Sequence, residues 1–388
     1  MTAKVTSIAR VRNAARKRDE TATVNGRLIV VLASVVLVLL VIGLGELMSA
    51  SSIRGIADAS DRFFYLKRQL VGLGIGLVAL LIVVRIPYQA YRRIAYPTFF
   101  ISLAGLMAVV MTGVSRNGSR RWLDLGIVTF QPSEISKLAV IIALATIFEK
   151  KGSLLLDRGH FFAPIGLIVG STALLIMLQP DLGTTLVVAA AALSVILVSR
   201  APLRYVAVLG VSSLAAALIL AVSESYRADR ITSFLDPWSD PNGTGYQVIQ
   251  GFYALGTGGL FGVGLGASRS RWSILPNAHT DFIFAIIGEE TGLVGALGVI
   301  ALCLFIALCG WSIAARAPDR FGRMLAAGIC GWLSFQALAN IGGVLGVLPI
   351  TGIVLPFVSY GATALITSLA AVGILINIAR QGRASPSR

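Results

Sequence analysis

Charged residues are scarce in this chain of 388 residues: only 13% are Asp, Glu, Lys or Arg, whereas 56% are hydrophobic. Soluble domains carry about a quarter charged residues, so the composition excludes an ordinary soluble protein. Histidine and cysteine are also rare, with two and three copies. Cys303, Cys309 and Cys330 fall inside apolar runs without metal-ligand spacing, so we expect them to be packing residues. A zinc site or a Ser-His-Asp triad cannot be argued from so few ligands.

Long apolar runs make up most of the chain. A helix that crosses a membrane needs roughly 20 mainly apolar residues. About ten such runs predict an all-α polytopic membrane protein with about ten transmembrane helices. Gln179-Pro180-Asp181 separates the fifth run from the sixth, since proline and a charge favour a break. The runs lie at residues 28–48, 66–86, 94–112, 132–149, 162–179, 182–199, 204–222, 281–312, 322–347 and 353–378.

The net charge of +15 lies mostly in short loops and at the two ends. Cytoplasmic segments of membrane proteins are enriched in Lys and Arg. This rule predicts that tails 1–27 and 381–388 are both cytoplasmic and flank one transmembrane domain at 28–380. The scattered charge also argues against nucleic acid as a partner, because the sequence contains no folded basic module.

One long loop, about residues 223–281, is predicted on the outer side between helices seven and eight. Loops of this length are usually functional. Its glycine-rich run Gly262-Val263-Gly264-Leu265-Gly266 resembles a dinucleotide-binding fingerprint but has no preceding strand or βαβ unit, so we reject that function. We expect a flexible re-entrant or amphipathic segment instead.

Several arginines on the predicted outer side are not required by the topology. They would suit an anionic ligand presented at the outer leaflet. Solvated loop charge, or contact with lipid headgroups, is the alternative reading. The residues are Arg116, Arg120, Arg121, Arg227, Arg230, Arg269 and Arg271.

A carboxylate marks the point where the long loop meets the eighth apolar run. Asp281 ends the polar stretch that begins at Leu275, and Glu289 and Glu290 follow just inside the run. Ionisable groups at membrane depth are costly and usually face a cavity, a partner or a substrate. Asp281 is therefore a candidate functional residue, with the N-cap of the eighth helix as its structural alternative. His279 is a second candidate, although a lone loop histidine is more often structural.

Two further constellations combine polar residues with helix breakers. Glu134 and Lys137 lie three residues apart near the start of the fourth run, where they either pair with each other or form part of a site. Pro349, Pro356 and Ser359 belong to a stretch, residues 348–361, that interrupts the last hydrophobic hairpin. Broken helices are tolerated where they line a cavity, and a simple kinked connection is the alternative.

Together these motifs resemble the SEDS family, which includes FtsW, RodA and SpoVE. The resemblance runs in the family's order from about residue 28 to 380. The residues from Ala278 to Glu290 look more like FtsW than RodA. Asn277 and Ala362-Thr363-Ala364 depart from the family pattern. The motifs are Asn117-Gly118-Ser119-Arg120-Arg121-Trp122, Gln131-Pro132-Ser133-Glu134 with Lys137, Gln179-Pro180-Asp181-Leu182-Gly183-Thr184, Phe234-Leu235-Asp236-Pro237, Gly245-Tyr246-Gln247, Leu275 to Phe284, and Leu355-Pro356-Phe357-Val358-Ser359-Tyr360-Gly361.

The resemblance implies a peptidoglycan glycosyltransferase that polymerises lipid II outside the cytoplasmic membrane, for septal synthesis in cell division. A RodA-type elongation polymerase, a lipid II flippase and a non-catalytic scaffold are the alternatives. The implied partners are lipid II, membrane lipid, a class B penicillin-binding protein and other division proteins.

The predicted chemistry centres on Asp281. An acceptor hydroxyl must lose a proton as it attacks the sugar, so Asp281 is expected to act as the base or to hold a divalent ion such as Mg²⁺ or Mn²⁺. Cations would stabilise the pyrophosphate leaving group. The predicted substrate-binding residues are Arg121, Glu134, Lys137, Asp181, Arg271, His279 and Ser359.

Overall fold

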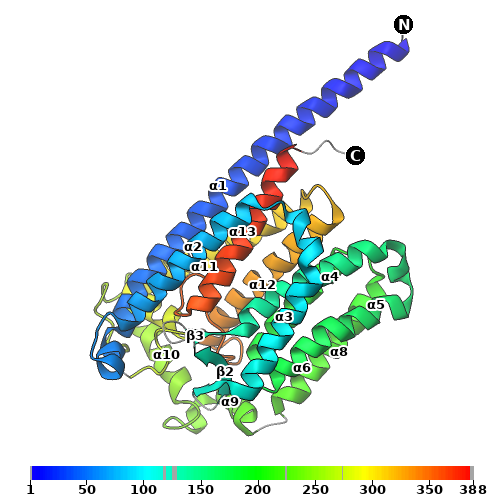
Figure 1. Ribbon diagram of the computed structural model, residues 1–388. Helices are drawn as coiled ribbons and strands as arrows, with labels where there is room; N and C mark the ends of the chain where they lie inside the picture. Colours follow the sequence, from blue (N-terminus) through cyan, green and yellow to red (C-terminus); the bar gives the residue numbers. More distant parts are fainter. Residues whose placement is uncertain (1, 117–118, 125–128, 223–224, 273, 385–388) are drawn as a thin grey trace.

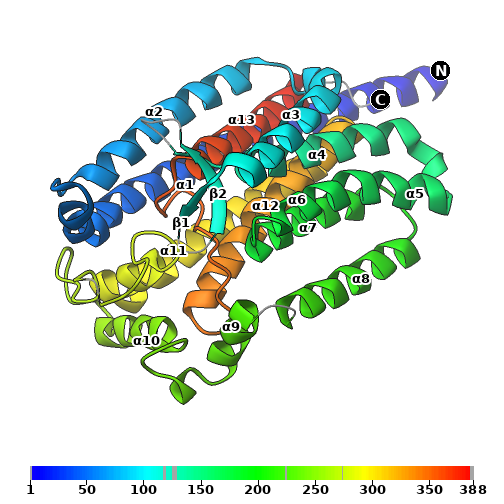
Figure 2. The same cartoon turned by 60° about the horizontal axis from the view of Figure 1, so that its bottom comes forward.

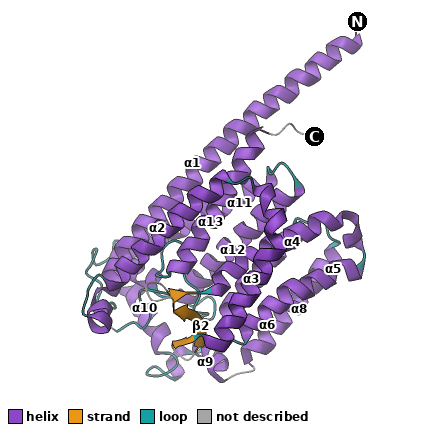
Figure 3. Cartoon of the chain, in the orientation of Figure 1, coloured by secondary structure: helices purple, strands orange, loops and turns teal. Residues whose placement is uncertain are grey.

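A computed structural model of the chain describes residues 2–116, 119–124, 129–222, 225–272 and 274–384. Helices dominate it, and a small antiparallel sheet lies at one end of the helical bundle (Figures 1 and 3). The motif residues Asn117 and Gly118, and residues 385–388 of the predicted C-terminal tail, lie outside these ranges. The α-helices are α1 (Thr2–Ala59), α2 (Phe64–Arg85), α3 (Tyr91–Thr112), α4 (Pro132–Lys151), α5 (Arg158–Ile165), α6 (Ser171–Met177), α7 (Leu182–Leu197), α8 (Leu203–Val222), α9 (Ser225–Leu235), α10 (Tyr246–Gly258), α11 (Ile283–Ala315), α12 (Arg320–Val344) and α13 (Ala362–Ala384).

Within the described residues, eight helical segments are long and apolar enough to cross a membrane. Two more of the predicted runs also fall on helices: α7 has only 16 residues, and α4 carries buried charged residues in its first two turns. A π-helical turn, η3 (Gly166–Gly170), joins α5 to α6 so that together they form one segment. Each predicted run therefore coincides with a helical segment.

The predicted start of the last run is wrong. Residues 353–361 are not helical, and α13 begins only at Ala362. Pro356 lacks a backbone N–H, and Gly352 and Phe357 have positive φ angles of 70° and 66°, so a helix cannot pass through this stretch. The first helix is also longer than its predicted run, because α1 continues without a break through the predicted N-terminal tail (Figure 1).

The central helices of the bundle are α12 and α13, where 78% of the residues in each membrane-length window are buried, against 11% in α8. Figure 2 shows α8 at the margin of the bundle, next to α9. Small residues allow the central helices to approach closely. A Cβ on Gly331 of α12 would lie 1.9 Å from the Ser194 hydroxyl of α7, and one on Gly328 would lie 2.6 Å from Ile141 of α4.

The irregular parts of the chain gather at one end of the bundle, here called the Asp281 end. The strands β1 (Val114–Arg116), β2 (Ser119–Asp124) and β3 (Thr129–Phe130) form an antiparallel sheet there in the order β1-β2-β3. Helices α9 and α10 lie at the same end (Figure 3). The predicted long loop is thus partly helical, and it also contains the short 3₁₀ turn η4 (Pro237–Ser239).

A break in α11 shows how the end of this loop is anchored. Gly292 has a φ of 70° inside α11, so the regular helical hydrogen bonds stop there. Residues 259–264 supply replacements: the Leu293 N–H donates to the Gly259 carbonyl (2.9 Å) and the Val263 N–H donates to the Glu289 carbonyl (2.9 Å). A Cβ on Gly262 would lie 2.1 Å from the Glu290 carbonyl, so this close approach requires glycine. Residues 259–264 are therefore fixed against α11 by backbone hydrogen bonds on both sides of the break.

The predicted orientation can be tested with two exposed serines. Ser239 lies in η4 and Ser153 in η2 (Gly152–Leu156), at opposite ends of the bundle. If the Asp281 end is outside, Ser239→Cys will react with a membrane-impermeant maleimide in intact cells, and Ser153→Cys will react only after permeabilisation. The parent protein is the control, because two of its cysteines are buried and the third is partly buried. The reverse labelling pattern would overturn the predicted topology.

Candidate functional site

Asp281 lies in the turn immediately before α11. The N-cap residue of α11 is Phe282, and no side chain caps the helix. The Asp281 carboxylate instead accepts a hydrogen bond from the Thr280 hydroxyl (2.9 Å). The alternative role of Asp281 as a helix N-cap is therefore wrong, and its carboxylate is left for another task.

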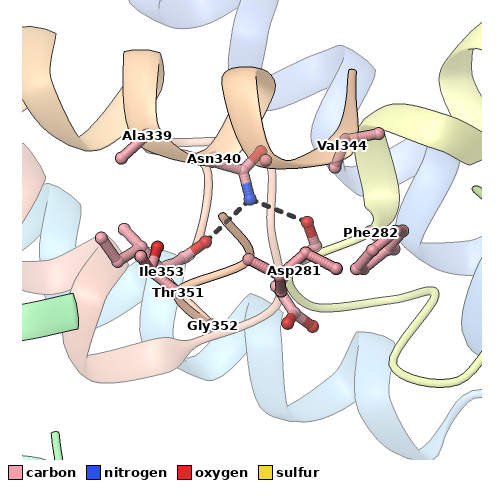
Figure 4. Close-up of a pocket in the computed structure, with 10 residues that line it drawn as sticks. Asp281, Phe282, Ala339, Asn340, Val344, Thr351, Gly352 and Ile353 are labelled. Carbon is pink, nitrogen blue, oxygen red and sulfur yellow. Dashed lines mark hydrogen bonds between the residues drawn. The ribbon is translucent and has the colours of Figure 1, made fainter. Parts of the chain in front are cut away.

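A small, partly open recess with a cavity volume of about 10 Å³, space for about one water molecule, lies beside this aspartate. Its walls come from the turn at Asp281, from α12 at Asn340, and from the non-helical segment at residues 350–353. Figure 4 shows the Asp281 carboxylate extending away from the Asn340 amide, on the other side of the Asp281 backbone. The recess has room for a few atoms, such as a hydroxyl group or an ion, but not for a whole sugar chain.

The surroundings of Asp281 raise the pKa of its carboxyl group. Burial raises the pKa of the Asp281 carboxyl, and the charges of Arg230 and Arg121 oppose this rise without cancelling it. Arg230 comes from α9 and donates a hydrogen bond to the Ile350 carbonyl on the recess wall (3.0 Å). A carboxyl group with a raised pKa beside two cations is typical of a functional site.

Arg121 connects the sheet to the start of α7. Its guanidinium donates to the Pro180 carbonyl (2.6 Å) and lies 3.5 Å from the Asp181 carboxylate. Asp181 caps α7 through the Thr184 N–H (3.0 Å) and hydroxyl (2.8 Å). The first turn of α7 touches the recess wall, because a Cβ on Gly183 would lie 2.6 Å from the Thr351 carbonyl. Arg121 and Asp181 are therefore connected to the recess wall through the first turn of α7.

Lys137 and Glu134 form an ion pair inside the bundle. The Lys137 ammonium lies 2.8 Å from the Glu134 carboxylate, donates to the Gln336 side-chain oxygen (2.9 Å), and lies 4.7 Å from the centre of the Trp332 ring. Lys137 is only 1% exposed. The structure thus shows the pairing that was the structural alternative for these two residues.

Gln336 links this ion pair to the recess wall. Its amide donates a hydrogen bond to the Val354 carbonyl (3.0 Å), next to Ile353 in the recess lining. Thr367 of α13 also reaches the Glu134 carboxylate, at 3.4 Å. Glu134 and Lys137 therefore support the segment that lines the recess.

His279 and Ser359 have local structural partners. The His279 ring packs against Tyr65 and Tyr360, with centroid distances of 4.7 and 5.8 Å. Burial, followed by the charge of Arg54, lowers the pKa of His279 to about 4, so the ring is neutral at neutral pH. The Ser359 hydroxyl accepts a hydrogen bond from the Leu355 N–H (2.8 Å) and closes a turn.

Arg271 belongs to a second polar cluster between α1 and α11. It donates to the Ser49 hydroxyl (3.4 Å), which in turn donates to the Glu290 carboxylate (2.5 Å). Glu290 also accepts from the Gly266 N–H (2.7 Å), and Glu289 accepts from the Ser268 hydroxyl (2.6 Å). The two glutamates therefore hold the loop of residues 266–270. Among the described residues, no hydrogen bond or ion pair links Arg271 to Asp281.

The structure adds residues that the sequence did not single out. Asn340 and Gln336 place side-chain amides at the recess wall. Arg230 was predicted only as one of several arginines on the outer side, without a role at Asp281. Polar amides four residues apart in an otherwise apolar helix were the available signal. Within the described ranges, no group of three or more His, Cys, Asp and Glu side chains forms a metal site.

These features define the class of the protein: a polytopic helical membrane protein with a partly buried, ionisable site at one end of its bundle. A family model described as "Cell cycle protein", covering FtsW, RodA and SpoVE, matches residues 30–384. Stage V sporulation protein E of Bacillus subtilis (strain 168) is 42% identical over 91% of this chain and 97% of its own length. A probable peptidoglycan glycosyltransferase FtsW of Geobacter sp. (strain M18) is 37% identical over 88% of this chain and 94% of its own.

Solved structures agree with these relatives. A chain from work described as "Structural coordination of polymerization and crosslinking by a peptidoglycan synthase complex" superposes with a TM-score of 0.74 and 32% identity, over 92% of this chain and 97% of that one. The rod shape determining protein RodA of Thermus thermophilus gives a TM-score of 0.67 and 30% identity, over 90% and 96%. This chain belongs to the FtsW/RodA/SpoVE family of multi-pass membrane proteins.

The buried ion pair predicts a stability pattern. Lys137→Met leaves the Glu134 carboxylate without its cation, which costs roughly 3–5 kcal/mol of folding stability. The double variant Glu134→Gln/Lys137→Met removes both charges and should recover most of that loss. Thermal unfolding of the detergent-solubilised protein measures both effects. Equal destabilisation of the single and double variants would show that the pair is not coupled.

Proposed function

We propose that this chain is a peptidoglycan glycosyltransferase that polymerises lipid II into glycan strands at the outer face of the cytoplasmic membrane. The observation that carries the proposal is the Asp281 carboxylate, which adjoins a recess, caps no helix and has a raised pKa. Relatives named probable peptidoglycan glycosyltransferase FtsW support the same activity.

In this reaction Asp281 is the general base. The acceptor hydroxyl must lose a proton as its oxygen attacks the anomeric carbon of the donor sugar. Asp281 lines the recess, which has space for a group the size of a hydroxyl. The raised pKa makes the ionised carboxylate a stronger base than an exposed aspartate.

Cations near the recess stabilise the departing undecaprenyl pyrophosphate. Arg121 and Arg230 both act electrostatically on Asp281, so their charges reach the place where the leaving group develops negative charge. Both come from segments at the Asp281 end, namely β2 and α9.

The other predicted substrate-binding residues have roles that depend on where they lie. We propose that Asp181 holds Arg121 toward the substrate, and that Glu134 and Lys137 act from behind the recess wall through Gln336. His279 and Ser359 shape the turns on either side, and Arg271 meets the substrate from the second cluster.

A divalent cation fits the same place. Mg²⁺ is usually bound by one or two carboxylates together with substrate phosphates and water, and Asp281 supplies one carboxylate. Mg²⁺ or Mn²⁺ held there would neutralise charge on the pyrophosphate.

The division role is the finer part of the proposal. The relatives named FtsW and SpoVE are 36–42% identical to this chain, against 30% for the solved RodA. A complex described as coordinating polymerization and crosslinking supports a class B penicillin-binding protein as partner. Depletion in the native host should give filaments without septa, seen by microscopy. Rounded cells would instead favour a RodA-type role in elongation.

Replacement of Asp281 by Asn tests the chemistry directly. The amide keeps the size of the side chain but removes the base, so polymerisation should fall by roughly two to four orders of magnitude, the range that such catalysis contributes. The assay is strand synthesis from lipid II by folded, partner-bound protein, with lipid II binding measured alongside. Asp240→Asn is the matched control, because Asp240 is an exposed carboxylate that caps a turn in the same outer segment.

The pH dependence of strand synthesis distinguishes Asp281 from His279 as the base. A base works only when ionised, so a raised pKa moves the loss of rate on acidification above the usual aspartate value of about 3.9. His279 titrates only near pH 4 and does not account for such a limb. Partial rescue of Asp281→Asn by added Mg²⁺ or Mn²⁺ would favour the ion-holding role. Near-normal synthesis by Asp281→Asn would refute the catalytic role and favour a flippase or scaffold.

A further inference from the structure

The non-helical segment at residues 350–354 depends on α12 for its hydrogen bonds. Its carbonyl groups cannot pair within a helix, and lipid offers them no donors. Gln336 and Asn340 lie four residues apart and therefore on one face of α12. Their amides donate to the Val354 carbonyl (3.0 Å) and the Ile353 carbonyl (2.7 Å).

Asn340 makes a second bond that Gln336 does not make. Its side-chain NH₂ also donates to the main-chain carbonyl of Asp281 (2.8 Å), so the two N–H groups bridge two separate segments (Figure 4). Asn340 is only 4% exposed. Its amide therefore fixes the Asp281 backbone against the opposite wall of the recess.

The other hydrogen bonds of Asp281 lie within its own turn. Its carboxylate is bonded to the neighbouring hydroxyl of Thr280, which moves with the same turn. The next residue, Phe282, donates its N–H to the Asn277 carbonyl at a long 3.4 Å, again within that turn. That turn is also tied to the non-helical segment two residues earlier, where the Tyr360 N–H donates to the His279 carbonyl (3.1 Å). The bond from Asn340 thus joins the turn to a helix that is buried along most of its length.

We propose that Asn340 is a positioning residue for Asp281: through the main chain, it holds the carboxylate at the depth where it meets the acceptor hydroxyl. This inference rests on the proposed function of Asp281. Misplacement of a reacting group by about 1 Å can cost 100-fold in rate. Loss of the bridge should therefore lower turnover while leaving substrate binding in place.

The test uses two variants of the full-length protein bound to its partner. Asn340→Leu keeps the side chain's approximate volume and removes both donors, and Asn340→Asp keeps its shape while removing the donors at neutral pH. Each should lower kcat for strand synthesis from lipid II by about 10- to 100-fold, with the Kd for lipid II changed less than about threefold.

Asn377→Leu is the matched control. Asn377 is another buried amide that bridges two segments, since it accepts from the Tyr88 N–H (3.0 Å) and donates to the Val84 carbonyl (2.7 Å), but it lies at the other end of the bundle. We expect Asn377→Leu to lower thermal stability as Asn340→Leu does, with kcat per folded molecule unchanged. An equal fall in kcat would mean that loss of any buried amide slows the enzyme, and would overturn the inference.

Double variants show whether Asn340 acts through Asp281. In the Asp281→Asn background, Asn340→Leu should lower the residual rate by less than about threefold, because the group it positions is already gone. A full additional loss would refute positioning. Should Asn340→Leu not fold, Asn340→Asp gives the same comparison. If Asp281→Asn is inactive while both Asn340 variants keep wild-type kcat, only the positioning inference fails; if Asp281→Asn is active, the proposed function itself fails.

Discussion

Backbone carbonyl groups that lie inside a membrane protein without a helix must find donors within the protein. The site depends on how this requirement is met at residues 348–361. Asn340 and Gln336 donate to its carbonyls from α12, while Gln69 of α2 accepts from the Gly361 N–H and donates to the Ser359 carbonyl (3.1 and 3.2 Å). Side-chain amides on two helices thus replace the helical hydrogen bonds. The recess exists because this segment is held open between α12 and α13.

Paired buried charges also stabilise the segments around the recess. Lys137 and Glu134 neutralise each other behind the recess wall, and Glu289 and Glu290 are satisfied by hydroxyl and backbone N–H groups of the loop that leads to Asp281. Asp281 differs from these groups, because its carboxylate accepts one hydrogen bond from a side chain, the adjacent Thr280. Paired charges fix the scaffold, and in the described part of the chain the Asp281 carboxylate is in no ion pair.

The sequence predicted the helices well because a membrane span needs a long apolar run, and such runs are visible in residue order alone. The predicted start of α13 was wrong because Ile353, Val354 and Leu355 are as apolar as the residues of a membrane-spanning helix. Only their hydrogen bonds with residues distant in the sequence show that they are not helical. Asp281 stood out as a charge at a membrane boundary. The sequence did not show which arginines lie near Asp281. Arg230 acts on Asp281 and Arg271 packs against α1, and these tertiary contacts cannot be read from residue order.

The break at Gly292 divides α11 into two rigid rods of unequal length. The shorter rod, residues 283–290, is bonded to residues 262–264 on one side and ends at the turn that carries Asp281. At 1.5 Å per residue it is about 12 Å long, so a tilt of about 10° at the joint would move the aspartate by about 2 Å. Such a displacement exceeds the tolerance of a proton transfer. The hydrogen bonds that residues 259–264 make on both sides of the break therefore hold the direction of the short rod, and with it the position of Asp281.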